Sequence, residues 1–232
     1  MKVSLTKVLM TAVAGFAALA SIVTIAPSTN ARTGAVVSIQ DTSQVHPGPI
    51  SAADRKALLD LMTKTKEDFI ASIRGLNAAQ WDFKPSPFSW SVAQASEHII
   101  LSEDYIFGYS QQLLKSPAQA RTGRPSGDED KGVLTRVGDR SHRIMNPAAI
   151  APKGRFKTPD EAIAAFTAKR DHNIEYVKTT QDDLRFHLSS DGSGGQMDAY
   201  ELLLLMAGHS GRHTQQIKEV EANPKYPAGN AH

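Results

Sequence analysis

The sequence has no cysteine among its 232 residues. Disulfide bridges, thiolate chemistry by the chain's own side chains and a lipid-modified N-terminal cysteine are therefore excluded. Even without residues 1–31, about 200 residues remain. A chain of that length can bury enough apolar surface to fold without covalent cross-links. Internal repeats and low-complexity segments are also missing, so a solenoid or a repeat array is not expected.

The chain also lacks a surplus of charge once its first residues are set aside. The formal net charge is +2, and Lys2 and Lys7 are the only charged residues within 1–31. Without them the chain carries 24 basic and 24 acidic residues. This balance gives no support to a nucleic-acid partner, or to a membrane partner for the mature chain.

Residues 1–31 have the pattern of a secretory signal peptide. The two lysines precede an acid-free apolar run from Val8 to about Ala26, and small residues follow up to a cleavage point after Ala31. We therefore expect a secreted or periplasmic mature protein. The alternative is a protein anchored in the membrane by an uncleaved segment, since about 19 residues can just span a bilayer.

Four later segments combine helical periodicity of apolar residues with a capping signature at their start. Each is about 20 residues long, and no segment has a convincing strand pattern. We therefore predict an all-α helical bundle over residues 51–222, after a flexible lead-in at 32–50 and before a C-terminal tail at 223–232. The capping pairs are Ser51–Asp54, Ser91–Gln94, Thr158–Glu161 and Asp198–Glu201.

A long connection, 117–157, separates the second predicted helix from the third. It contains four prolines and five glycines, and we predict that it is irregular. Connections of about 40 residues are uncommon in compact domains and are usually functional or loosely ordered. Four of its basic residues are candidates to line an approach for an anionic substrate, although such charges are more often simply solvated. These residues are Arg136, Arg140, Arg143 and Lys153.

Two histidines interrupt the apolar stripe of the last helix. His209 and His213 are four residues apart, so their imidazoles leave the same helix face. His98, two turns into the second helix, is the candidate for a third ligand. Three neutral imidazoles suit Zn, Ni, Fe or Cu and leave positions open for water or substrate. The alternative is a set of core histidines that are only hydrogen-bonded, and a ring separation above about 8 Å would favour it.

Three charged residues are candidates for supporting roles. Arg170 lies on the inner stripe of the third helix, so it must reach a partner or line a wet cavity, where it could orient an anion. Glu97 and Glu103 are candidates to support the metal ligands from the second helix. Arg170 and Glu97 are also the two candidates for a catalytic role. For Glu97, an equal alternative is that its side chain faces solvent or caps a neighbour.

With these residues in view, the chain resembles the DinB/YfiT-like family of metal-dependent proteins over residues 51–222. The resemblance implies an up-down four-helix bundle with a divalent metal on His98, His209 and His213, and dimerisation as in many members. Characterised members include thiol S-transferases and isomerases that use low-molecular-weight thiols. The matching motifs are Leu76 with residues 81–85, Trp90-Ser91-Val92 with Glu97-His98, and residues 208–217.

From the residues and the resemblance together we predict an exported metal-binding enzyme that acts on a small molecule. Its three-histidine site would activate a thiol or water for transfer or hydrolysis, with Zn, Ni or Fe as the ion. The alternatives are a non-catalytic metal-binding or stress-related bundle and a purely structural bundle. Two features depart from the family: the predicted export, and the long segment 117–157, which would reshape the pocket.

Overall fold

The computed structural model describes residues 47–119, 121, 126–141, 147–190 and 195–229. The chain divides into two units, Met1–Gln44 and Val45–His232, and all described residues belong to the second. The predicted signal peptide and most of the predicted lead-in lie outside the described residues. Both therefore stay predictions.

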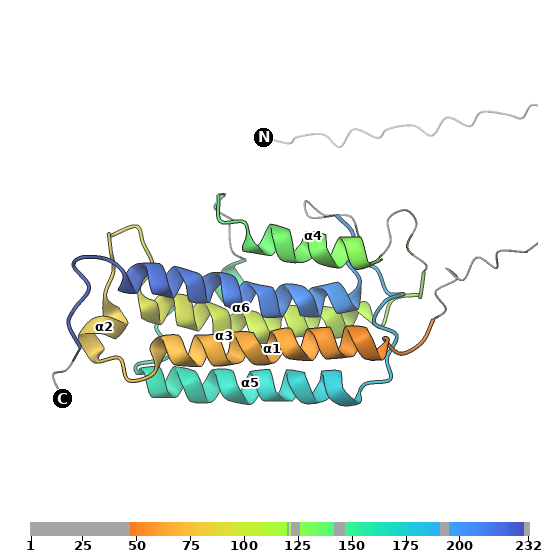
Figure 1. Cartoon of the computed structure of the whole chain (residues 1–232), viewed down its shortest axis with the longest axis horizontal. Coiled ribbons are helices and arrows are strands. Elements are labelled where there is room, and N and C mark those ends of the chain that lie inside the picture. The colour runs from red at the N-terminus through yellow and green to blue at the C-terminus, as the bar shows by residue number, and fades with distance from the viewer. Residues whose placement is uncertain (1–46, 120, 122–125, 142–146, 191–194, 230–232) are drawn as a thin grey trace, which may run out of the picture. The chain divides into compact units, whose positions relative to one another are not determined.

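The regular structure of the described residues is helical throughout (Figure 1). Within the described ranges, the sole β-type pairing is an isolated bridge between Leu188 and Asp198. Among the helices described, none combines the length and the hydropathy needed to cross a membrane. The elements are α1 (Ala52–Ile73), α2 (Ala78–Asp82), α3 (Val92–Leu113), α4 (Ser126–Gly138), the 3-10 helix η1 (Ala148–Ile150), α5 (Pro159–Thr179) and α6 (Ala199–Glu221).

Complete capping boxes open two of the long helices, as the sequence predicts. At α3, the Ser91 hydroxyl accepts from the Gln94 N–H while the Gln94 side chain accepts from the Ser91 N–H, both at 3.1 Å. At α6, Asp198 and Glu201 make the same reciprocal pair at 2.7 and 2.8 Å. Each box satisfies two backbone donors that the first helical turn leaves without partners.

The other two predicted caps form only in part. Ser51 Oγ accepts from the Asp54 N–H at 3.0 Å, but the Asp54 carboxylate lies 3.3 Å from Arg185. Thr158 caps α5 through the N–H of the third helical residue, and Pro159 occupies the first helical position. The sequence therefore locates all four helix starts, while tertiary contacts redirect one of the predicted capping carboxylates.

Four helices, α1, α3, α5 and α6, form the predicted all-α four-helix bundle, which is confirmed. Figure 1 shows that α1 and α6 run in one direction and that α3 and α5 run in the other. The parallel course of α3 and α5 is clear from two contacts, because Asp104 pairs with Lys169 and the rings of Phe107 and Tyr176 lie 5.2 Å apart. The order is thus up-down-down-up, so directions alternate from α1 to α3 and from α5 to α6 but not from α3 to α5.

The long connection 117–157, called the crossover from here on, makes this order possible, because it carries the chain back along the bundle. It was predicted to be irregular, yet it contains α4, which lies along α6 (Figure 1). The two helices approach so closely that a Cβ on Gly208 would lie 2.7 Å from Val137 Cγ1. Arg212 Nη1 donates to the carbonyls of Val137 and Asp139 and so caps the C-terminal end of α4.

A buried polar group divides the bundle core into two apolar clusters. Arg170 and Glu103 are both fully buried, and Arg170 Nε and Nη2 donate to the Glu103 carboxylate at 2.9 and 2.5 Å. Arg170 Nη1 donates to the Met62 carbonyl and Thr65 Oγ1, and Nη2 donates also to Ser210 Oγ. These contacts engage all five guanidinium donors and join α1, α3, α5 and α6 at one level.

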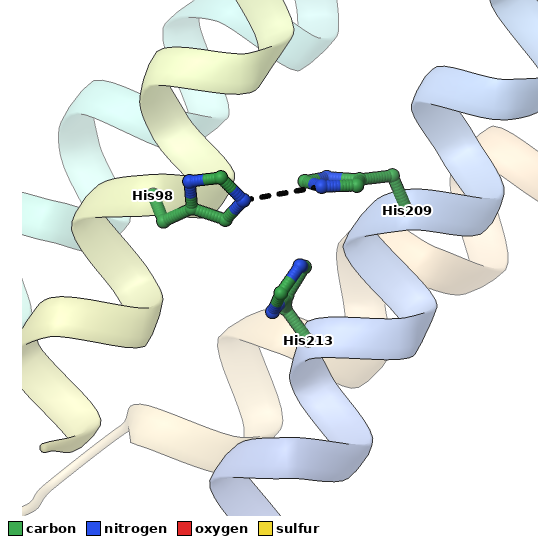
Figure 2. A group of neighbouring side chains, drawn as sticks. All are labelled: His98, His209 and His213. Carbon is green, nitrogen blue, oxygen red and sulfur yellow. Dashed lines mark hydrogen bonds between the residues drawn. The ribbon is translucent and has the colours of Figure 1, made fainter. Parts of the chain in front are cut away.

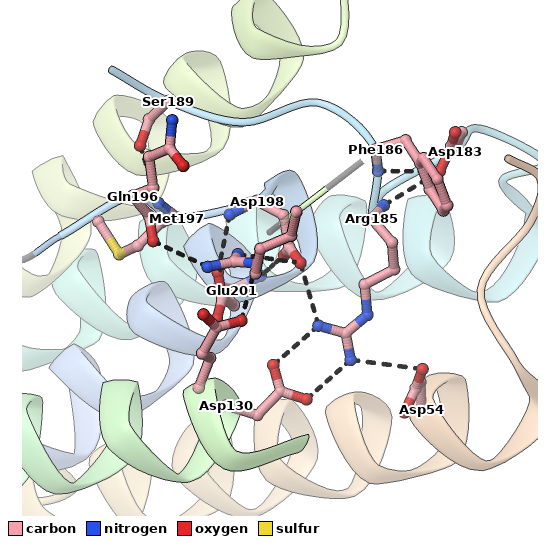
Figure 3. Close-up of polar contacts among 12 residues, drawn as sticks. Asp54, Asp130, Asp183, Arg185, Phe186, Ser189, Gln196, Met197, Asp198 and Glu201 are labelled. Atoms are coloured by element: carbon pink, nitrogen blue, oxygen red, sulfur yellow. Dashed lines mark hydrogen bonds and ion pairs between the residues drawn. The ribbon is translucent and has the colours of Figure 1, made fainter. Parts of the chain in front are cut away.

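At the end of the bundle where α6 begins, Arg185 joins three helices (Figure 3). Its guanidinium donates to both carboxylate oxygens of Asp130 on α4, at 2.8 and 2.7 Å, and lies 3.2 Å from Asp198 and 3.3 Å from Asp54. It also stacks 3.8 Å from the ring centroid of Tyr200. Burial raises the pKa of Asp198 to about 7, although the charge of Arg185 opposes the shift. This group fixes the start of α4 against α1 and α6.

Candidate metal centre

Three histidines from two helices, α3 and α6, converge at one point (Figure 2). His98 Nε2 lies 3.2 Å from His209 Nε2, and one nitrogen from each of the three rings lies within 4.8 Å of the others. Ring centroids are 4.5–4.9 Å apart. The convergence of His98, His209 and His213 predicted from the sequence is therefore confirmed. It arises because α3 and α6 pack side by side, so that the second turn of α3 faces the middle turns of α6.

Hydrogen bonds to the outer nitrogens fix the tautomers of two rings. His98 Nδ1 lies 2.9 Å from the Ile150 carbonyl in η1, and His213 Nδ1 lies 2.8 Å from Gln216 Oε1. A carbonyl oxygen and an amide oxygen only accept, so each Nδ1 carries the proton. His98 Nε2 therefore accepts the 3.2 Å hydrogen bond from His209 Nε2, and the Nε2 lone pair of His213 is left for another partner.

The donor set fits a divalent transition metal. Ligands at about 2.0–2.1 Å in a tetrahedral arrangement place two nitrogens about 3.3–3.4 Å apart, close to the 3.2 Å between His98 and His209. Within the described part of the chain, His209 Nδ1 is buried without a hydrogen-bond partner. The His209 ring is therefore held through its inner nitrogen, which lies at hydrogen-bonding distance from His98 Nε2, and a bound ion would replace that contact.

All three rings are held in the neutral form, which metal binding requires. Burial lowers the pKa of His98, and the hydrogen bond to Ile150 offsets the shift only in part. Burial, followed by the neighbouring histidines and Arg212, holds the pKa of His209 well below its usual range. Burial, followed by His98, lowers the pKa of His213 to about 3. Near neutral pH the site therefore offers lone pairs and resists protonation.

The surroundings of the site are aromatic and cationic. The Trp90 ring lies 4.9 Å from the His98 ring and 5.9 Å from the His213 ring, between centroids. Arg212 comes between His209 and His213 in the sequence of α6, and Arg140 donates to the Arg212 carbonyl. No carboxylate among the described residues hydrogen-bonds to the three imidazoles. A cation held by neutral ligands alone keeps its full charge, so the site favours anionic ligands.

Comparison with known proteins agrees with this geometry. A model of the DinB superfamily matches residues 61–217. The chain belongs to the DinB superfamily. It is also similar in structure to YfiT from Bacillus subtilis, described as a probable metal-dependent hydrolase with an unusual four-helix bundle topology. That match has 13% identity and a TM-score of 0.51, and it covers 77% of this chain and 91% of YfiT. No curated protein matches the sequence.

The structure places the three charged candidates, Glu97, Glu103 and Arg170, in two different settings. Glu97 is 2% exposed and binds the crossover instead of facing solvent. Burial raises the pKa of Glu97, but hydrogen bonds from Lys153, Arg155 and Gly154 outweigh it, so the net pKa shift is downward. Glu103 and Arg170 belong to the polar group of the core. Because all five donors of Arg170 are engaged there, the structure offers no support for its candidate role in orienting an anion.

The basic residues of the crossover also take different places. Arg136 is exposed on α4, whereas Arg140 pairs with Glu219 at the C-terminal part of α6. Lys153 has an exposed side chain, and its N–H donates to Glu97. Arg143 lies outside the described residues. Of the three that the structure describes, Arg140 is therefore the one that hydrogen-bonds to α6, the helix that carries His209 and His213.

Sequence reasoning missed the role of the 150–155 segment. The Ile150 carbonyl that orients His98 is a backbone group, so no residue type marks it in the sequence. One signal was available, because Gly154 has a φ of +75°, a conformation that favours glycine. A glycine between charged residues in a long connection is too common a feature to identify the contact by itself.

Proposed function

We propose that this DinB-superfamily protein is a metal-dependent enzyme that acts on a small anionic or thiol-containing molecule, by hydrolysis or by group transfer. The observation that carries the proposal is the meeting of three neutral imidazoles, two of them buried and that of His209 half-buried, with one ring nitrogen of each within 4.8 Å of the others. His98, His209 and His213 would hold the ion. The description of YfiT as a probable metal-dependent hydrolase supports hydrolysis in particular.

A divalent cation, when bound, would supply Lewis acidity that lowers the pKa of a nucleophile such as water or a thiol. The chain's own residues prepare the site for it. The Ile150 carbonyl and Gln216 orient two of the rings, and Trp90 covers them on one side. The neutral ligands and the neighbouring Arg212 attract an anionic group of the substrate.

The remaining parts of the proposal concern location and assembly. The N-terminal pattern supports export, followed by cleavage near Ala31, with an uncleaved membrane anchor as the alternative. A homodimer is proposed from the family resemblance, and a small molecule is proposed as the substrate.

The first test is elemental analysis of the purified protein and of single-histidine variants. We expect about one equivalent of a transition metal in the wild type, and loss of it in His98→Ala and His209→Ala. His172→Ala is a matched control, because His172 lies on α5 with an exposed side chain and contacts Phe107. Metal contents that are low in the wild type, or equal in all variants, would contradict the proposed site.

The second test separates an enzyme from a metal-binding protein without turnover. Wild type and His209→Ala are assayed against thiol-conjugation, ester and amide substrates, with and without added metal. We expect a metal-dependent rate on one of these classes in the wild type and not in His209→Ala. Stoichiometric metal without any metal-dependent rate would favour the non-catalytic alternative.

A further inference from the structure

The Glu97 carboxylate is bound by three consecutive backbone donors of the crossover. The N–H groups of Lys153, Gly154 and Arg155 lie 2.8, 2.7 and 3.1 Å from its oxygens, and Arg155 Nη1 adds a fourth bond at 2.6 Å. Successive N–H groups turned toward one anion form a concave backbone nest. A carboxylate that is 2% exposed needs such partners, because burial without them is costly.

The nest depends on the conformation of Gly154. Its φ is +75°, in the left-handed region that residues with a Cβ rarely adopt. An added Cβ would meet only Lys157 Nζ, at 3.8 Å, which is ordinary van der Waals contact. Any harm from a substitution here would therefore come from the backbone conformation and not from a steric clash.

The same stretch of chain touches α3 at a second place. Ile150, three residues before the nest, is 6% exposed and accepts from His98 Nδ1 at 2.9 Å. Glu97 and His98 are neighbours on α3, so their side chains point in directions about 100° apart. The crossover is thus attached to α3 at two points, one of which is a ring of the metal centre.

We propose that Glu97 is a positioning residue: by holding the 153–155 nest, it places the Ile150 carbonyl on His98 Nδ1 and fixes the tautomer whose Nε2 faces His209. Glu97 itself acts through the backbone and touches neither ion nor substrate. Without the nest, the Ile150 carbonyl leaves its place and the His98 ring exchanges between tautomers. The consequence for metal affinity rests on the proposed function, whereas the tautomer does not.

The direct test is the tautomer of His98 in metal-free protein, read from nitrogen–proton correlation spectra of the imidazole rings above pH 7. Signals absent from His98→Gln identify the ring. We expect a single Nδ1–H tautomer in the wild type and a mixture in both Glu97→Gln and Gly154→Ala. Gly75→Ala is the matched control, since Gly75 also has a φ of +75°, with nothing within 4 Å of an added Cβ, and follows α1.

A second readout is the affinity for zinc, measured by competition with a chelator. Loss of an outer partner of a metal-binding histidine typically weakens binding about 10–100-fold, and we expect that loss in Glu97→Gln and Gly154→Ala but not in Gly75→Ala. Folded variants that keep the wild-type tautomer of His98 would overturn the inference. If the wild type binds neither zinc, nickel nor iron, the proposed function fails, but the tautomer comparison still decides the role of Glu97.

Discussion

The buried pair Arg170–Glu103 permits a prediction with a magnitude. Replacing Arg170 with Met leaves the Glu103 carboxylate fully buried, and its remaining partners among the described residues are Ser210 Oγ at 3.1 Å and Asn173 Nδ2 at 3.2 Å. Breaking a buried ion pair on one side lowers the free energy of unfolding by about 3–5 kcal/mol. Because domains of this size are stable by about 5–15 kcal/mol, either Arg170→Met or Glu103→Leu should remove a large share of the stability.

The double variant should be much less affected than the sum of the two single variants. Thr65 Oγ1 and Ser210 Oγ also donate to carbonyls of their own helices, at 2.9 and 3.2 Å, so they keep a partner when the charges are gone. Asn173 keeps only the weak contact with Met206 Sδ. We therefore expect the double variant to lose about 1–3 kcal/mol, the amount for one unsatisfied buried amide.

Urea unfolding followed by circular dichroism measures these free energies of unfolding. The slope of the free energy against urea concentration should be the same in all variants. Lys169→Met is the matched control. Lys169 on α5 also pairs with a carboxylate on α3, but this pair lies at the surface, where the Asp104 side chain is 63% exposed. Such pairs contribute about 0–1 kcal/mol. Single losses near those of the control, or a double loss equal to the sum, would refute the reasoning.

Two further predictions concern the histidines of the site and the packing of α4 on α6. Metal-free protein should lose stability as the pH falls from about 6.5 toward 3, because the unfolded histidines take up protons near pH 6.5 while the folded pKa values are lowered, that of His213 to about 3. Urea unfolding at pH 7.5 and 4.5 should show a smaller loss for His213→Gln than for the wild type, and equal losses would contradict this. Gly208→Ala should lower thermal stability by displacing α4 from α6, since the new Cβ would lie 2.7 Å from Val137 Cγ1. Adding Val137→Ala should restore part of the loss, whereas no restoration would place the cause elsewhere.

The features that sequence reasoning predicted are local ones. Ser91 with Gln94 and Asp198 with Glu201 form their boxes within one turn, so the signal and the structure lie in the same few residues. The pair His209 and His213 is likewise local, because helix geometry alone places the two rings on one face. His98 required the further assumption that α3 packs beside α6, which the bundle satisfies.

The features that were missed depend on tertiary packing. Helix α4 contains two internal glycines, Gly127 and Gly132, which lower its intrinsic helix propensity. It is stabilised by contacts that its own sequence does not show: the close approach of Val137 to Gly208 and the capping of its last carbonyls by Arg212. The partner of Arg170 was similarly hidden, since a buried cation on one helix does not reveal which helix supplies the carboxylate.

The direction of α5 and the candidate metal centre have a common origin in the crossover. If α5 ran antiparallel to α3 after a short loop, no chain would pass beside His98, and its Nδ1 would lack the Ile150 carbonyl. The parallel course of α3 and α5 forces the chain to return along the bundle, and on that return it contacts α6 through α4 and α3 through Glu97. The connection 117–157, which the sequence predicts to be irregular, therefore completes the surroundings of the three histidines, and changes to it should affect the metal centre as directly as changes to the bundle helices.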